Sequence, residues 1–111
     1  MEEQTPFARL AAVMARLRGP DGCPWDREQT LESLRTYLIE ETYELLEAIE
    51  LKDPVHLREE LGDVLLEVVF LSQVCKELGL FQIDDVVNGI VDKLIRRHPH
   101  VFGENPVQTA G

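Results

Sequence analysis

Glu40-Glu41-Thr42-Tyr43-Glu44 and Glu59-Glu60-Leu61-Gly62-Asp63 are the two acidic clusters that decide the fold of this chain. Each cluster offers two carboxylates three residues apart, and side chains at that spacing share one face of a helix. The residues between the clusters, Leu51-Lys52-Asp53-Pro54, indicate a turn. Two helices would therefore run antiparallel and place four carboxylates opposite one another, those of Glu41, Glu44, Glu60 and Asp63.

Such a convergence of negative charge has a chemical consequence. Four carboxylates repel one another inside a small protein unless a cation lies among them. A ligand set made only of oxygen atoms suits a hard cation such as Mg²⁺ or Mn²⁺ better than zinc or copper. The spacing therefore predicts a divalent-metal site between the two acidic helices.

Glu41 also falls in the middle of an apolar stripe on its predicted helix, formed by Leu34, Leu38, Leu45, Ala48 and Ile49. A charged residue almost never occupies the buried face of a helix without a partner. A buried ion pair with Arg35 or Arg58 is the structural alternative to a metal. That pair would explain Glu41 alone, but it would not explain two matched pairs of carboxylates.

Start and stop signals divide the chain into about four helices, which predicts an all-α antiparallel bundle. Thr5-Pro6 begins the first helix, and Gly19-Pro20 ends it before a loop over residues 21–26. The other helices are expected from Asp26 or Thr30 to Leu51, from Pro54 to Leu78 before Gly79, and from a cap at Asp84 or Asp85 to His98-Pro99-His100.

The third predicted helix is apolar around most of its circumference. Its main stripe contains Leu57, Leu61, Val64, Val68, Leu71 and Cys75, whereas Leu66, Val69 and Phe70 lie away from it. A helix of this kind must be covered nearly all round. The other helices of one chain are too short to do this, so we expect a homo-oligomer, a dimer or tetramer, that completes the bundle.

Composition narrows the class of protein. The 111 residues carry a net charge of −10, which argues against binding to duplex nucleic acid, because such a protein needs a positive surface. The two cysteines, Cys23 and Cys75, suggest no disulfide framework. No signal segment or membrane span is recognisable. These features predict one reduced, cytoplasmic domain over residues 1–111, with a core over 5–102 and a flexible tail over 103–111.

Two further features suggest contacts with a phosphorylated ligand. Trp25, the only tryptophan, either plugs the end of the bundle or faces a ligand base from its loop. Lys93, Arg96 and Arg97 form the one dense basic cluster near the end of the last long helix. Cations there either stabilise the helix C-terminus or bind a triphosphate opposite the metal.

Four segments of the sequence together resemble the MazG nucleoside triphosphate pyrophosphohydrolases. They are Cys23-Pro24-Trp25-Asp26, residues 38–44, residues 58–63 and residues 92–102, which run from Asp92-Lys93-Leu94 to Val101-Phe102. The likeness extends from about Phe7 to Phe102. It implies an all-α fold in which helices from two subunits form a bundle, and Mg²⁺-dependent hydrolysis of nucleoside triphosphates to monophosphate and pyrophosphate.

The resemblance also implies roles for individual residues. The metal ligands of the family motif fall on Glu41, Glu44, Glu60 and Asp63, and Glu40 joins Glu41 as a catalytic candidate that either supports the ligands or activates water. Trp25, Lys93, Arg96 and Arg97 are the candidate substrate contacts. Many family members carry two such domains, so this chain is expected to be a short single-domain member or one half of a longer protein.

Three other functions fit parts of the pattern. The substrate range of the enzyme could be limited to non-standard or deoxy nucleotides, which would be a house-cleaning role. The shape of the pocket would determine this specificity. A non-catalytic oligomerising module could keep the acidic cluster as a metal-binding core, although such a module gains nothing from burying Glu41. A di-iron bundle normally needs a Glu-x-x-His pair, and neither acidic helix has one.

Overall fold

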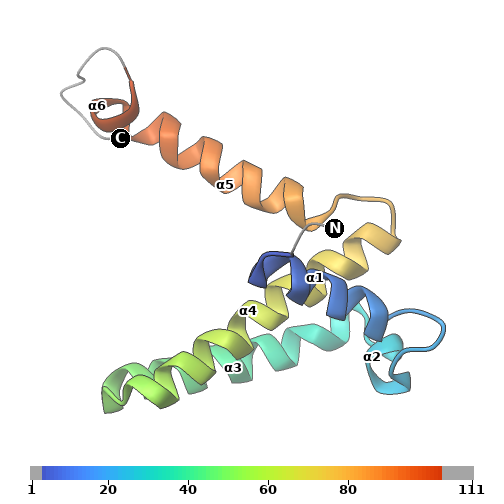
Figure 1. Cartoon of the computed structure of the whole chain (residues 1–111). Helices are drawn as coiled ribbons and strands as arrows, with labels where there is room; N and C mark the ends of the chain where they lie inside the picture. Colours follow the sequence, from blue (N-terminus) through green and yellow to red (C-terminus); the bar gives the residue numbers. More distant parts are fainter. Residues whose placement is uncertain (1–3, 104–111) are drawn as a thin grey trace.

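The computed structural model describes residues 4–103, and within that range the chain is all α-helical (Figure 1). The predicted fold class is therefore confirmed. The predicted tail lies outside the described residues, apart from Gly103. The helices are α1 (Pro6–Leu17), α2 (Pro24–Glu28), α3 (Leu31–Leu51), α4 (Pro54–Glu77), α5 (Ile83–Arg97) and α6 (Pro99–Phe102). No described helix has both the length and the apolar character that crossing a membrane requires.

Local capping explains where the helices begin. The Thr5 hydroxyl accepts a hydrogen bond from the Ala8 N–H at 3.1 Å, and the Asp53 carboxylate accepts one from the Val55 N–H at 3.0 Å. Both caps precede a proline at the first helical position, as predicted. The predicted cap of α5 at Asp84 or Asp85 is wrong, because α5 begins after Gln82, whose N–H donates to the Asp85 carboxylate instead.

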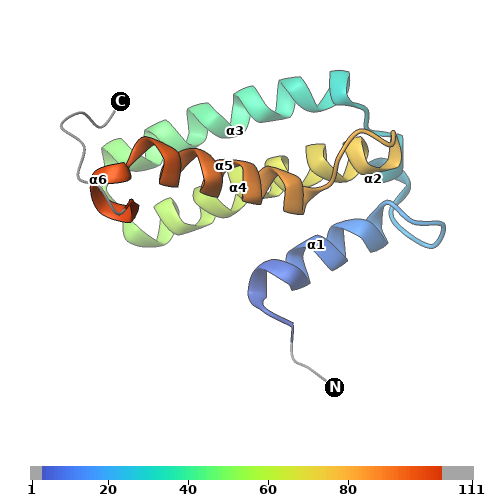
Figure 2. The same ribbon diagram turned by 90° about the horizontal axis from the view of Figure 1, so that it is seen from above.

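The centre of the fold is the antiparallel pair of α3 and α4, with α1 packed across the second half of α4 (Figures 1 and 2). Met14, Leu34, Val69, Phe70 and Val74 form the buried core between these three helices. Leu34 comes from the start of α3 and Val74 from the end of α4, so the core occupies one end of the pair. The acidic residues lie nearer the other end.

The structure corrects the prediction for the apolar faces of α4. Val69 and Phe70 were assigned to the side left for another subunit, but they are buried. Leu61 and Val68 were assigned to the main stripe, but they are exposed. The reason is that α1 covers the side of α4 that carries Val69 and Phe70, which periodicity alone could not reveal. The uncovered apolar surface of α4 is thus formed by Leu61, Leu65 and Val68.

Residues 24–28 form the short helix α2, so the predicted loop around Trp25 is only partly correct. Arg18 fixes α2 against α4. Its guanidinium donates hydrogen bonds to the backbone carbonyls of Asp26 and Gln29, at 2.6 and 2.8 Å, and to the Glu77 carboxylate at 3.0 Å. These contacts hold the pair of residues Trp25 and Asp26 beside the α3–α4 pair.

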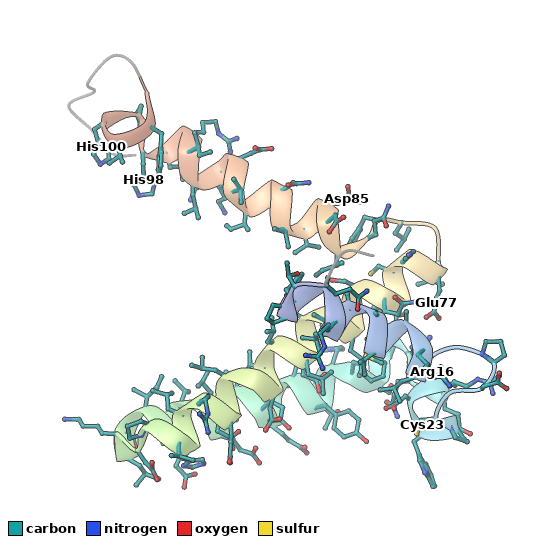
Figure 3. All side chains as sticks on the ribbon, viewed as in Figure 1. Arg16, Cys23, Glu77, Asp85, His98 and His100 are labelled. Atoms are coloured by element: carbon teal, nitrogen blue, oxygen red, sulfur yellow. The ribbon has the colours of Figure 1, made fainter. Side chains whose placement is uncertain are left out.

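The helix α5 leaves the end of α4 and points away from the α3–α4 pair (Figure 1). Ile83, its first residue, packs against the core, but the apolar residues that follow are exposed, including Ile90, Val91, Leu94 and Ile95. Side chains surround α5 without a neighbouring helix beside them, and His98 and His100 lie at its far end, remote from Glu77 (Figure 3). Within one chain, α5 therefore does not pack along the bundle.

Candidate metal centre

The turn between α3 and α4 determines which acidic residues meet. Lys52 ends α3 in the left-handed conformation, with φ 56° and ψ 27°. Glu44 and Glu60 lie at equal separations from Lys52 along the sequence, and so do Glu41 and Asp63. Antiparallel pairing about this turn therefore brings each residue of the first acidic cluster level with one of the second.

The four carboxylates converge as the spacing predicts. One oxygen from each of Glu41, Glu44, Glu60 and Asp63 lies within 4.8 Å of the others. Glu60 is only 9% exposed and Glu41 is half-buried, whereas Glu44 and Asp63 are exposed. The cluster therefore has a buried floor and an open side through which a ligand can approach.

The two buried members of the cluster are electrostatically strained. Burial raises the pKa of Glu41, and repulsion from Glu44, Asp63 and Glu60 raises it further. Burial likewise raises the pKa of Glu60, with further contributions from Glu44 and Asp63 that nearby His56 partly offsets. Each residue also has a buried Oε2 atom without a hydrogen-bond partner. Unpaired buried carboxylate oxygens facing one another fit a cation, because positive charge would relieve both the desolvation and the repulsion.

The ion-pair alternative for Glu41 is wrong in the described part of the chain. Arg35 lies 3.8 Å from Glu32 instead, and no ion pair is formed there by Glu41 or Arg58. The His56 imidazole lies 3.4 Å from Glu60, one helical turn away. It also lines an acidic hollow with Glu44, Glu47 and Glu60, and so stands at the edge of the carboxylate cluster. Sequence patterns assign no role to His56, although its spacing of four residues from Glu60 is a usable signal.

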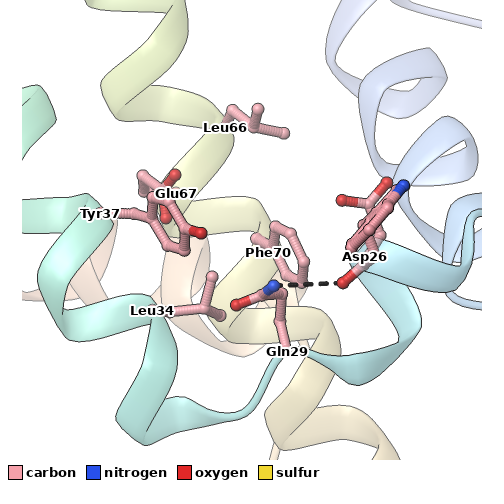
Figure 4. A pocket seen from close by; sticks show the side chains of 8 residues that line it. Asp26, Gln29, Leu34, Tyr37, Leu66, Glu67 and Phe70 are labelled. Carbon is pink, nitrogen blue, oxygen red and sulfur yellow. Dashed lines mark hydrogen bonds between the residues drawn. The ribbon is translucent and has the colours of Figure 1, made fainter.

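A second concavity lies beside the carboxylates. A pocket of about 270 Å³ is lined from α2 by Trp25 and Asp26, from α3 by Leu34 and Tyr37, and from α4 by Leu66, Glu67 and Phe70, with Gln29 between α2 and α3. Figure 4 shows Tyr37 and Glu67 at one side of it and Asp26 at the other. Trp25 is 76% exposed, so it does not plug the end of the bundle.

The predicted site residues are only partly brought together within one chain. Glu40 is exposed on α3 beside Glu41 and stands outside the set of four converging carboxylates. Lys93, Arg96 and Arg97 are exposed on the part of α5 that projects away from α3 and α4 (Figure 1). The basic cluster therefore does not face the carboxylates of its own chain.

Glu67 is a buried carboxyl to which sequence patterns assign no function. It is 7% exposed and its Oε2 atom is buried without a hydrogen-bond partner. Burial, and then the charge of Asp63, raise its pKa. The available signal was its position one turn beyond Asp63, on the same side of α4 as Glu60.

Comparison with known proteins agrees with this architecture. Residues 29–102 match the MazG nucleotide pyrophosphohydrolase domain. The chain is 58% identical over 100 residues to the nucleoside triphosphate pyrophosphohydrolase/pyrophosphatase MazG of Thermotoga maritima, covering 90% of this chain and 39% of that protein. It is 50% identical over 103 residues to the nucleoside triphosphate pyrophosphohydrolase of Escherichia coli K12, covering 92% of this chain and 39% of that protein.

A solved structure shows the same fold. The crystal structure of a mazG-related protein from Thermotoga maritima superposes with a TM-score of 0.73 at 29% sequence identity, covering 90% of this chain and 86% of that one. The chain spans well under half the length of the two sequence relatives described above. The domain match nevertheless includes both acidic clusters and the basic end of α5. The chain therefore belongs to the MazG nucleotide pyrophosphohydrolase family.

Proposed function

We propose that this domain hydrolyses nucleoside triphosphates to nucleoside monophosphate and pyrophosphate in the presence of Mg²⁺, with Mn²⁺ as a working substitute. The observation that carries the proposal is the convergence of four carboxylates within 4.8 Å, two of which have buried unpartnered oxygens. Membership of the MazG nucleotide pyrophosphohydrolase family supports this type of reaction. The names of the Thermotoga and Escherichia relatives support the same substrate class.

In this proposal, Glu41, Glu44, Glu60 and Asp63 hold the cation. Their all-oxygen donor set suits Mg²⁺, which takes carboxylates together with water and substrate phosphates. When bound, a divalent cation supplies positive charge to the triphosphate oxygens and acidifies water. The exposed members of the set, Glu44 and Asp63, leave the open side on which a triphosphate can enter.

The reaction needs a water molecule aimed at the α-phosphorus. The water oxygen forms a bond to that phosphorus, the bond to the bridging oxygen breaks, and pyrophosphate leaves with that oxygen, in line with the attacking water. The water proton passes to a carboxylate and then to solvent. We assign the role of proton acceptor to Glu40, because it is next to Glu41 in the sequence but is not one of the four converging carboxylates. Trp25 offers an exposed aromatic face on which the base can stack.

A second copy of the chain would complete this site. α5 exposes an apolar face that no other described helix of its own chain covers, and it carries Lys93, Arg96 and Arg97 at its far end. The acidic cluster on α3 and α4 has the opposite charge, and among residues 4–103 its one basic neighbour in an ion pair is His56. We therefore propose a homo-oligomer in which α5 of one protomer covers α3 and α4 of its partner and brings the three cations to the triphosphate.

Pyrophosphate release tests the activity. The chain is incubated with standard and altered nucleoside triphosphates, with Mg²⁺ and with EDTA, and the nucleotide product is identified. The proposal predicts metal-dependent release of pyrophosphate with a monophosphate as co-product, and the ranking of altered nucleotides tests a house-cleaning role. A folded chain that binds Mg²⁺ but releases nothing from any of them would instead support a non-catalytic helical module.

Complementation tests the shared site. Glu41→Gln should abolish activity by removing a metal ligand. The double change Arg96→Ala and Arg97→Ala should abolish activity by removing the basic cluster. If the two halves of a site come from different protomers, mixed oligomers of the two inactive variants regain activity. Mixed oligomers that form but stay inactive would contradict this arrangement, as would an active double arginine variant.

A further inference from the structure

Glu67 is a buried acid for which neither the fold nor the metal site accounts. It is 7% exposed, and its Oε2 atom is buried with no hydrogen-bond partner. Leaving a buried polar group unpaired costs about 1–3 kcal/mol, and more for a charged group. A leucine of similar size at this position would avoid the cost. Local rules of this kind are broken most often at functional sites.

The metal cluster does not explain Glu67. The described acidic residues whose oxygens converge within 4.8 Å are Glu41, Glu44, Glu60 and Asp63, and Glu67 is not among them. Glu67 follows Asp63 by four residues, which places its backbone about 6 Å further along α4. On α3, Tyr37 precedes Glu41 by the same interval. Because the helices are antiparallel, both residues lie in the same direction from the cluster, towards α2.

Glu67 lines the same pocket as Trp25 and Tyr37, and it lies beside Tyr37 in Figure 4. Leu34, Leu66 and Phe70 make the other walls of the pocket mainly apolar. The pocket volume of about 270 Å³ lies near the lower end of the range for small-molecule sites, about 300 Å³, and so suits a single heterocycle. Aromatic and apolar walls with a few polar groups are typical of such sites. A nucleotide whose phosphates lie at the carboxylate cluster would extend its base in this direction.

Gln29, another polar side chain of the pocket, is already engaged in hydrogen bonds. The Gln29 amide donates to the Trp25 carbonyl at 3.1 Å and accepts from the Ser33 hydroxyl at 2.6 Å. Gln29 therefore fixes the position of Trp25 rather than offering a group to a ligand. Two carboxylates line the pocket: Asp26 is half-buried at the opposite side, whereas Glu67 is the buried acceptor.

We infer that Glu67 is a specificity-determining residue, whose carboxyl accepts a hydrogen bond from an exocyclic amino group of the nucleobase while Trp25 and Tyr37 contact the faces of the ring. This assignment rests on the proposed function, and it names the class of substrate: amino-bearing bases such as adenine and cytosine are preferred over their oxo counterparts, hypoxanthine and uracil. A carbonyl oxygen in place of the amino group would face the Glu67 oxygens without a proton between them.

The test compares substrates that differ only in this group. For the unmodified chain and for Glu67→Gln, kcat/KM is measured for CTP against UTP and for ATP against ITP, with inorganic tripolyphosphate as the substrate without a base. A glutamine amide can donate to a carbonyl, so the CTP/UTP and ATP/ITP ratios should fall about tenfold or more in the variant. Tripolyphosphate hydrolysis and Mg²⁺ affinity should stay unchanged. Glu59→Gln, the same change on the exposed side of α4, should leave every ratio unchanged.

Three results would overturn the assignment. One is an unmodified chain that shows no preference for the amino-bearing base. Another is a Glu67→Gln variant whose CTP/UTP and ATP/ITP ratios of kcat/KM equal those of the unmodified chain. The last is an equal loss on all substrates including tripolyphosphate, which would indicate a metal or structural role.

Nucleotide binding separates this inference from the proposed activity. The fluorescence of Trp25, the only tryptophan, reports contact with a base without turnover or metal. In EDTA, CMP should quench this fluorescence at lower concentration than UMP, and Glu67→Gln should remove the difference. Selective quenching by a chain that hydrolyses no triphosphate would preserve the role of Glu67 and refute the proposed hydrolysis. Equal quenching by CMP and UMP would refute the role of Glu67, whatever the activity.

Discussion

The two ends of the α3–α4 pair are built on opposite principles. At one end, α1 covers the pair, and residues such as Met14 are 1% exposed in an apolar core. At the other end, none of the described helices covers the pair, and carboxylates converge among exposed apolar residues. One end stabilises the fold by burial. The other end carries electrostatic repulsion between carboxylates, which a bound cation would relieve. Stability and activity should therefore respond to different substitutions.

The largest effect should come from the acidic end. Glu41→Gln keeps the shape of the side chain but removes a charge proposed to hold the cation, so kcat/KM should fall by about 10³-fold or more, roughly 4 kcal/mol of transition-state stabilisation. Pyrophosphate release at saturating Mg²⁺ measures this loss. Glu50→Gln, an exposed glutamate of α3 outside the carboxylate cluster and the acidic hollow, is the matched control and should retain activity. A Glu41→Gln chain with nearly normal rates would refute the assignment of the metal centre.

The core end should show the largest loss of stability. Met14→Ala opens a cavity between α1, α3 and α4, and it should lower the free energy of unfolding by about 2–5 kcal/mol. Urea denaturation measures this, with Val13→Ala as the control, because Val13 is 55% exposed on the same helix. The folded fraction of Met14→Ala should still bind Mg²⁺ with normal affinity. Loss of Mg²⁺ binding in that fraction would show that the two ends are coupled.

Stability should change with pH in opposite directions at the acidic end and at the core end of the α3–α4 pair. The pKa values of Glu41, Glu60 and Glu67 are raised from 4.5, so the folded chain binds their protons more tightly than the unfolded chain. The stabilisation is full below pH 4.5 and is lost as the pH rises through the raised values. In EDTA, the melting temperature should therefore fall between pH 4.5 and neutrality.

The Arg18 hydrogen bonds lower the pKa of Glu77, which gives the opposite dependence, but that stability is lost only below pH 4.5. The window above pH 4.5 thus isolates the acidic end. Mg²⁺ should reverse the trend, since it binds the ionised carboxylates. Glu41→Gln should reduce the fall in melting temperature with pH in EDTA, and it should raise the melting temperature in EDTA at neutral pH. A melting temperature in EDTA that rises towards neutrality would contradict the proposed repulsion.

The smallest effect should come from the turn that joins α3 and α4 at the acidic end. Lys52 has a φ of 56°, a conformation that glycine adopts without steric cost. Lys52→Gly should therefore raise the free energy of unfolding by about 0.5 kcal/mol after the greater unfolded-state entropy of glycine is included. Lys76→Gly in the last turn of α4 should instead lower it by about 1 kcal/mol. Thermal denaturation of both variants in the same buffer checks the difference in sign.

Local signals predicted much of the fold and the acidic cluster. The caps at Thr5 and Asp53 depend on hydrogen bonds to residues within the first helical turn, so the sequence specifies them directly. The convergence of the four carboxylates depends on helix periodicity and on a short turn placed symmetrically between the clusters. Neither requires knowledge of distant contacts.

Features that depend on distant contacts were not predictable in the same way. The side of α4 that is buried depends on where α1 packs, and the position of Trp25 depends on the hydrogen bonds of Arg18 to α2 and Glu77. The direction of α5 is equally invisible to periodicity, which showed only that this helix is amphipathic. Glu67 was missed because its significance lies in the pocket formed with Trp25 and Tyr37, which come from other helices.

The central claim is that Glu41, Glu44, Glu60 and Asp63 hold a divalent cation. The most direct measurement is anomalous X-ray scattering at the manganese absorption edge from crystals of the chain grown with Mn²⁺. We expect an anomalous peak within about 2.5 Å of carboxylate oxygens from at least three of the four residues. A folded chain with no peak there, or with a peak held by other residues, would contradict the claim.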